Sequence, residues 1–115
     1  MLEISPDKIA RVILQAREIE NIGGAGSSAS HELREFLASL NEDEQASLVA
    51  VMWIGRESFT AEELEEAMAT ARTEKSIPTE DYLMGEPALA EYLESGMEAL
   101  GLSPDEAEDD VMARH

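Results

Sequence analysis

The most informative segment of the sequence is Asn41-Glu-Asp-Glu-Gln-Ala-Ser-Leu-Val-Ala-Val-Met-Trp-Ile-Gly-Arg56. From Ala46 to Ile54 its apolar residues cover every side of a helix instead of forming one stripe. A helix that has no polar face belongs in the interior of a protein. The sequence therefore predicts a buried helix over 42–55 at the centre of the fold.

Capping signals mark both ends of this helix. Asn41 and Glu44 have the spacing of a capping box, and the acidic residues at 42–44 suit the positive end of the helix dipole. Gly55 is the predicted C-terminal stop.

Similar signals divide the rest of the chain into helices. Apolar residues recur three and four positions apart, and no segment of length alternates apolar and polar residues as a strand does. Helices are predicted over 6–20, from Ser28 or Ser30 to 40, over 61–74, over 79–84 and from Pro87 onward. The expected fold class is all-α: a compact, bundle-like domain of five or six short helices around the buried central helix.

The length of the chain fits one domain. It has 115 residues, of which 43% are hydrophobic, so it can bury a core of its own. Residues 1–101 are predicted to form this single helical domain. Residues 102–115 are acidic with few apolar side chains, and are predicted to be a flexible C-terminal tail.

The composition also bears on location. The chain has no cysteine, and its first residues include acids where a signal peptide carries bases. No run approaches the roughly 18 apolar residues of a membrane span. We expect a cytoplasmic protein that does not bind a membrane.

The net charge of −18 is unevenly distributed. Residues 1–56 hold five basic and nine acidic residues, whereas residues 57–115 hold three basic and seventeen acidic residues. Such a field repels nucleic acid and attracts basic proteins or cations. Binding to nucleic acid is therefore not expected. The acidity either solvates exposed helix faces, as in adaptation to salt, or attracts a basic partner.

Two blocks of the sequence resemble a known family. The first runs from Leu40 to Arg56 and continues through Phe59 and Glu62-Glu63, and the second is Tyr82-Leu-Met-Gly-Glu-Pro-Ala-Leu-Ala-Glu-Tyr-Leu-Glu-Ser-Gly96. In this order and at this separation they resemble a bacterial family catalogued as domain of unknown function 3775, over roughly residues 30–101. The resemblance implies a bacterial source and an intracellular α-helical domain, and it implies no reaction, ligand or catalytic residue.

No motif for catalysis or for a cofactor emerges from the residues themselves. His31 and Glu35 stand four positions apart, but they supply two ligands where zinc takes three or four. The glutamates at 62–66 lack the inward Glu-x-x-His pairs of a di-metal bundle. We expect no cofactor, no metal and no catalytic residue, and prefer protein interaction over catalysis.

Two hypotheses of function remain, with self-association through methionine side chains as a further possibility. The first is a regulatory or interaction module that binds a basic protein through its acidic C-terminal half. The second is a small-molecule-binding or enzymatic domain with a pocket near Trp53, Arg56 and Tyr82. The candidate surface residues for a partner or ligand are Trp53, Arg56, Glu62, Glu63, Glu66 and Tyr82.

Overall fold

A computed structural model describes residues 2–22, 28–74 and 76–102, and within them the chain is entirely helical apart from its connections. The elements are α1 (Pro6–Ile22), α2 (Ser28–Ser39), α3 (Glu42–Gly55), a 3-10 helix η1 (Ala61–Glu63), α4 (Leu64–Thr73), α5 (Thr79–Met84) and α6 (Leu89–Ala99). No strand occurs in the described residues. The all-α prediction is confirmed.

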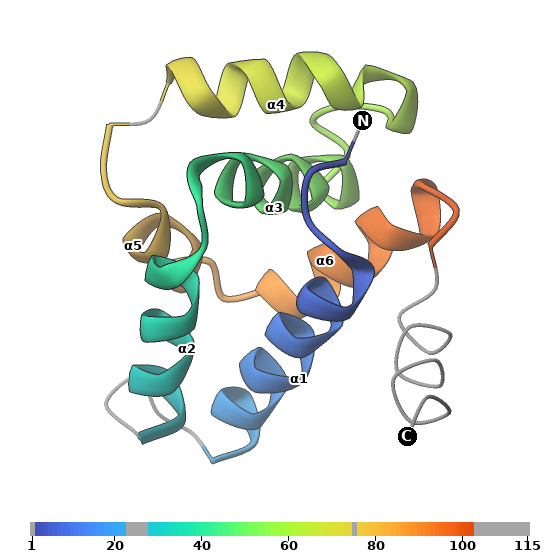
Figure 1. Cartoon of the computed structure of the whole chain (residues 1–115). Helices are drawn as coiled ribbons and strands as arrows, with labels where there is room; N and C mark the ends of the chain where they lie inside the picture. The colour runs from blue at the N-terminus through green and yellow to red at the C-terminus, as the bar shows by residue number, and fades with distance from the viewer. Residues whose placement is uncertain (1, 23–27, 75, 103–115) are drawn as a thin grey trace.

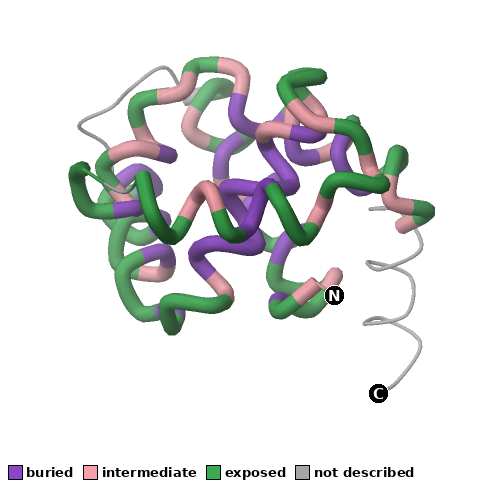
Figure 2. Tube along the Cα trace, turned by 90° about the horizontal axis from the view of Figure 1, so that it is seen from above, coloured by how far each residue is buried: buried purple, intermediate pink, exposed green. Residues whose placement is uncertain are grey.

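Helix α3 lies at the centre of the molecule. Every residue from Gln45 to Met52 is buried, as its apolar circumference predicts. α4 covers one side of α3, whereas α1 and α2 lie on the other, and α6 packs along it (Figure 1). Seen from above, the buried residues meet in the interior and exposed residues surround them (Figure 2).

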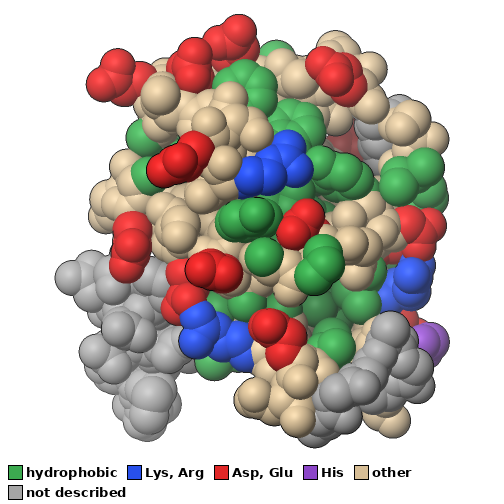
Figure 3. All heavy atoms as spheres, turned by 180° about the vertical axis from the view of Figure 1, so that it is seen from behind, with side chains coloured by type: hydrophobic (Ala, Val, Ile, Leu, Met, Phe, Trp, Pro, Cys, Tyr) green, Lys and Arg blue, Asp and Glu red, His purple; other side chains and the backbone are tan. Residues whose placement is uncertain are grey.

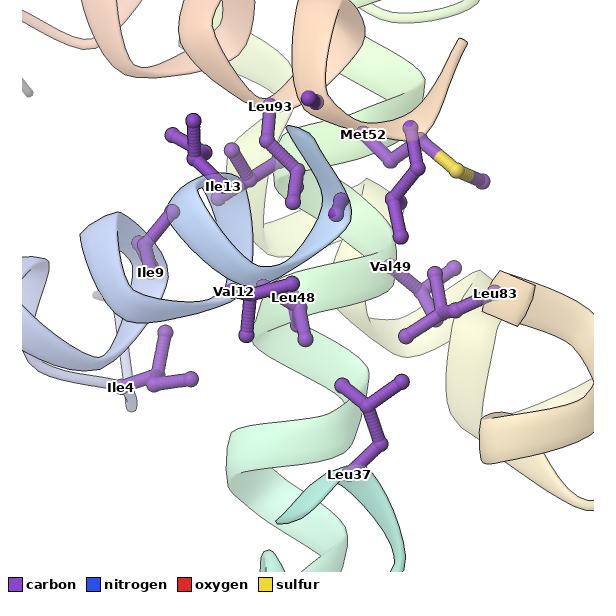
Figure 4. Close-up of a cluster of buried hydrophobic side chains, with 14 of the residues drawn as sticks. Ile4, Ile9, Val12, Ile13, Leu37, Leu48, Val49, Met52, Leu83 and Leu93 are labelled. Carbon is purple, nitrogen blue, oxygen red and sulfur yellow. The ribbon is translucent and has the colours of Figure 1, made fainter. Parts of the chain in front are cut away.

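The buried side chains form two clusters. The larger one joins side chains of α1, α2, α3, α5 and α6, among them Ile9, Leu37, Leu48, Leu83 and Leu93 (Figure 4). The smaller one lies between α3 and α4 and contains Ala50, Ala67 and Met68. Of the four methionines considered for self-association, Met52, Met68 and Met97 are buried, whereas Met84 is partly exposed.

The predicted cap of α3 is present in full. The Asn41 side-chain oxygen accepts the Glu44 backbone N–H at 2.8 Å, and the Glu44 carboxylate accepts the Asn41 backbone N–H at 3.1 Å. The buried Gln45 amide donates to the Leu37 carbonyl at 3.0 Å. This bond satisfies a carbonyl at the end of α2 and fixes α2 against the start of α3.

The end of α3 differs from the prediction in one respect. The helix does end at Gly55, but the residue in the left-handed conformation is Glu57, with φ of 68°. Its N–H bonds to the Ile54 carbonyl, and the Ser58 N–H bonds to the Trp53 carbonyl at 2.9 Å. These bonds form a Schellman motif in which glutamate occupies the usual glycine position.

Helix α6 ends with the same motif, here with a glycine. Gly101 has φ of 79°, and the Leu102 N–H bonds to the Met97 carbonyl at 2.7 Å. Leu102 packs against the larger core cluster. The remainder of the predicted acidic tail, residues 103–115, lies outside the described residues.

Candidate functional site

Three aromatic side chains meet at the end of α3. The ring of Trp53 stacks on that of Phe59 with centroids 5.7 Å apart and an interplanar angle of 26°. On its polar edge, the Trp53 indole N–H donates to the Tyr82 hydroxyl at 2.9 Å. Because the stack and the hydrogen bond act on different parts of the indole, they hold Trp53 in one orientation between α3 and α5.

A cavity of about 210 Å³ lies beside this indole, between α3, the end of α4 and the start of α5. We call it the Trp53 cavity. Its apolar lining consists of Val49, Trp53, Ala71, Ile77 and the ring of Tyr82. Its polar lining consists of Glu74, Ser76 and Thr79. Ile77, which is 49% exposed, is one of two large hydrophobic side chains that the described part of the molecule leaves exposed.

The structure brings together two of the three residues expected at a pocket. Trp53 and Tyr82 both line the cavity, whereas Arg56 does not. Instead, Arg56 is exposed and its Nε donates to the Ser58 hydroxyl at 3.1 Å within the turn that follows α3. No ion pair joins Arg56 to an acid among the described residues, so it is a free cation at this surface.

Sequence reasoning missed the other side of the cavity. Glu74, Ser76 and Ile77 precede Pro78, and Thr79 begins α5. Glu74 and Thr79 stand at the ends of the helices predicted over 61–74 and 79–84, and the residues between them show no helical periodicity, so the sequence did not place these side chains at one cavity. The one signal was Ile77, an isolated apolar residue in a polar turn.

The acidic residues expected at a partner surface are exposed. Glu62 and Glu63 lie on η1 and Glu66 lies in the first turn of α4, and all three face solvent. We call these three residues the acidic face. The Glu63 carboxylate also accepts the Thr60 backbone N–H at 2.8 Å, which is one of the two bonds of a capping box. Acidic side chains follow the upper edge of the molecule, where α4 lies, in Figure 3.

Most of the described basic side chains contact another helix of the same molecule. Of the six that the structure describes, four form ion pairs between different helices: Lys8–Glu44, Arg17–Glu94, Arg34–Asp81 and Arg72–Asp43. Arg11 lies over the Phe36 ring, 4.1 Å from its centroid, and so contacts α2. Basic residues are thus placed where helices meet, and many acids remain at the surface.

One of these pairs changes a pKa. The Lys8 ammonium donates a hydrogen bond to the Glu44 carboxylate, and together with the Asn41 backbone N–H it holds the pKa of Glu44 below its ordinary value of 4.5. Burial acts in the opposite direction and is the weaker effect. Glu44 is therefore a structural carboxylate that joins α1 to the cap of α3.

A metal site is not formed by the candidates that the sequence offers. His31 and Glu35 contact each other, with Nε2 and Oε1 3.3 Å apart, and both side chains are exposed. In the part of the chain that the structure describes, no three histidine, aspartate or glutamate side chains gather as metal ligands would. None of the helices in that portion is long and apolar enough to span a membrane.

Comparison with known proteins identifies the family to which the chain belongs. No match was found among curated proteins, and none among solved structures. The family model described as "Protein of unknown function (DUF3775)" matches residues 30–102, a span that runs from α2 to the end of α6 and includes the Trp53 cavity and the acidic face. This match covers more than half of the chain and agrees with the resemblance noted in the sequence. The chain therefore belongs to the DUF3775 family.

Proposed function

We propose that this chain is a cytoplasmic protein-interaction module of bacterial origin that binds a basic partner through the acidic face. The observation that supports the proposal is that most described basic side chains pair with acids elsewhere in the molecule. Four of the six described basic side chains form ion pairs between helices, and none of those pairs involves Glu62, Glu63 or Glu66. Three exposed carboxylates therefore stay available to a positively charged surface.

The charge of the whole chain supports the same conclusion. A net charge of −18 draws basic partners toward the molecule and repels nucleic acid. Exposed ion pairs contribute about 0.2–1 kcal/mol each. Three such pairs add roughly 0.6–3 kcal/mol, or about a 3- to 150-fold gain in affinity.

The proposal is tested by affinity capture from bacterial cells that make the protein. The bait is either the wild-type chain, a face variant with Glu62→Gln, Glu63→Gln and Glu66→Gln, or a control variant with Glu18→Gln, Glu32→Gln and Glu98→Gln. Both variants lose three exposed acids and keep the same net charge as each other. Glutamine at 63 retains an oxygen for the capping bond.

We expect a basic protein to be captured by the wild type and by the control variant, and to be lost with the face variant. Capture that is equal for all three baits would contradict the proposal, as would capture of no basic protein at low salt.

A further inference from the structure

The Trp53 cavity has no role in the proposed interaction, and its lining has a chemistry of its own. We propose that it binds the ammonium group of a primary amine. The inference rests on the charge, the hydrogen-bonding groups and the rings that surround the cavity.

Charge selects the sign of the ligand. Glu74 is the one charged side chain among the described residues that line the cavity. An anionic ligand would be repelled by this carboxylate and by the net charge of −18 on the whole chain. A cation would be attracted by both.

The polar groups select an ammonium that carries hydrogens. Glu74, Ser76 and Thr79, whose side chains all carry oxygen atoms, line the same cavity. A primary ammonium has three N–H donors and no acceptor, so it can bond to three such oxygens. Trp53 and Tyr82 also line the cavity and are held by their mutual hydrogen bond, and aromatic side chains of this kind attract cations.

The remaining lining selects a short apolar body. Val49, Ala71 and Ile77 provide aliphatic surface for an alkyl chain. The volume of about 210 Å³ lies below the range of about 300–1,000 Å³ that drug-sized ligands occupy. A short alkylammonium fits these limits, either as a free amine or as the end of a lysine side chain.

The test uses Trp53 itself as the reporter, because it is the one tryptophan of the chain. The full-length protein is titrated with n-butylammonium and, separately, with 1-butanol, which has a similar apolar body and no charge. We expect a saturable change in Trp53 emission with the amine and about tenfold weaker binding of the alcohol. Saturation-transfer NMR provides a second readout that does not depend on the emission of Trp53.

Two matched variants locate the ammonium group. Glu74→Gln should weaken n-butylammonium binding about fivefold, whereas Glu98→Gln, which removes an equal charge from an exposed site on α6, should change it less than twofold. Equal binding of amine and alcohol, equal effects of the two variants, or no binding by either readout would overturn the proposal.

Two peptides distinguish the sources of the ammonium. One carries a single lysine, and the other carries norleucine at that position. If the lysine peptide binds and the norleucine peptide does not, the cavity accepts the ammonium group of a protein side chain. If n-butylammonium binds and neither peptide does, the cavity accepts a free amine. Both results support an ammonium site.

Discussion

Gly55 of α3 lies against the backbone of Tyr92 of α6, so closely that a Cβ atom at Gly55 would be 1.7 Å from the Tyr92 carbonyl oxygen. Gly96 makes the reciprocal approach, because a Cβ atom there would be 2.1 Å from the Val51 carbonyl oxygen. Since backbone atoms cannot yield as a flexible side chain does, both positions require glycine. The pair sets the distance between the two helices that form the centre of the core.

Adding one methyl group at this crossing should separate α3 from α6. We expect Gly55→Ala to lower the free energy of unfolding by about 3 kcal/mol or more, because overpacking against backbone exceeds the usual cost of about 1–3 kcal/mol. Urea denaturation measures the change. Gly85→Ala is the control: its Cβ would lie 3.4 Å from the nearest atom, so alanine there should be neutral or stabilising by up to about 1 kcal/mol. Equal midpoints for Gly55→Ala and the wild type would refute the close approach.

The left-handed residue after α3 predicts a stabilising substitution. Glu57 has φ of 68°, a conformation that costs a residue with a side chain about 1 kcal/mol relative to glycine. Glu57→Gly should therefore raise the free energy of unfolding by about 0.5–1 kcal/mol. Glu57→Gln removes the same charge but keeps the side chain. If both variants changed stability equally, the gain would come from charge and not from the backbone.

The hydrogen bond between Trp53 and Tyr82 should be measurable in the same way. Tyr82→Phe removes the acceptor of the indole N–H, and we expect a loss of about 0.5–1.5 kcal/mol. The indole N–H resonance of Trp53 should shift in NMR spectra, because its partner is gone. Tyr92→Phe, at a tyrosine that does not bond to Trp53, should leave that resonance in place. An unchanged resonance in Tyr82→Phe would show that the bond is not formed in solution.

The lowered pKa of Glu44 predicts how stability depends on pH. A carboxyl group whose pKa is lower in the folded state stabilises the fold above its unfolded value, here the ordinary 4.5, and this contribution is lost as pH falls through the folded value. Glu44→Gln keeps an oxygen for the capping box and removes the titration. The variant should therefore lose less stability than the wild type between neutral pH and the pH range below 4.5. Parallel pH profiles of the two urea midpoints would contradict this role for Glu44.

The sequence predicted the helices well because their boundaries are encoded locally. Asn41 and Glu44 form both bonds that their spacing indicates, and Glu63 accepts the backbone N–H of Thr60. The apolar circumference of 46–54 correctly indicated the burial of every residue in it except Trp53, which is partly exposed. Gly55 was identified as a helix end, but its contact with Tyr92 joins residues distant in the chain and could not be anticipated from local spacing.

The candidate site was predictable only in part, for the same reason. Trp53 and Tyr82 stood out as aromatic residues near helix ends, and they do meet. Arg56 was grouped with them by its position in sequence, yet the turn through Glu57 directs its side chain to Ser58. The sequence did not identify Glu74 as a cavity residue, because no local pattern indicates that the segment before Pro78 lies beside α3.

Binding of a basic partner to the acidic face is measured by the dissociation constant of the captured partner. Calorimetric titration at two ionic strengths, about 0.05 M and about 0.2 M, compares the wild type with the face variant and the control variant. We expect the face variant to bind about 3- to 150-fold more weakly at the lower ionic strength, with a smaller dependence on salt, and the control variant to bind nearly as the wild type does. Equal dissociation constants for the face variant and the wild type at both ionic strengths would contradict the proposed interaction.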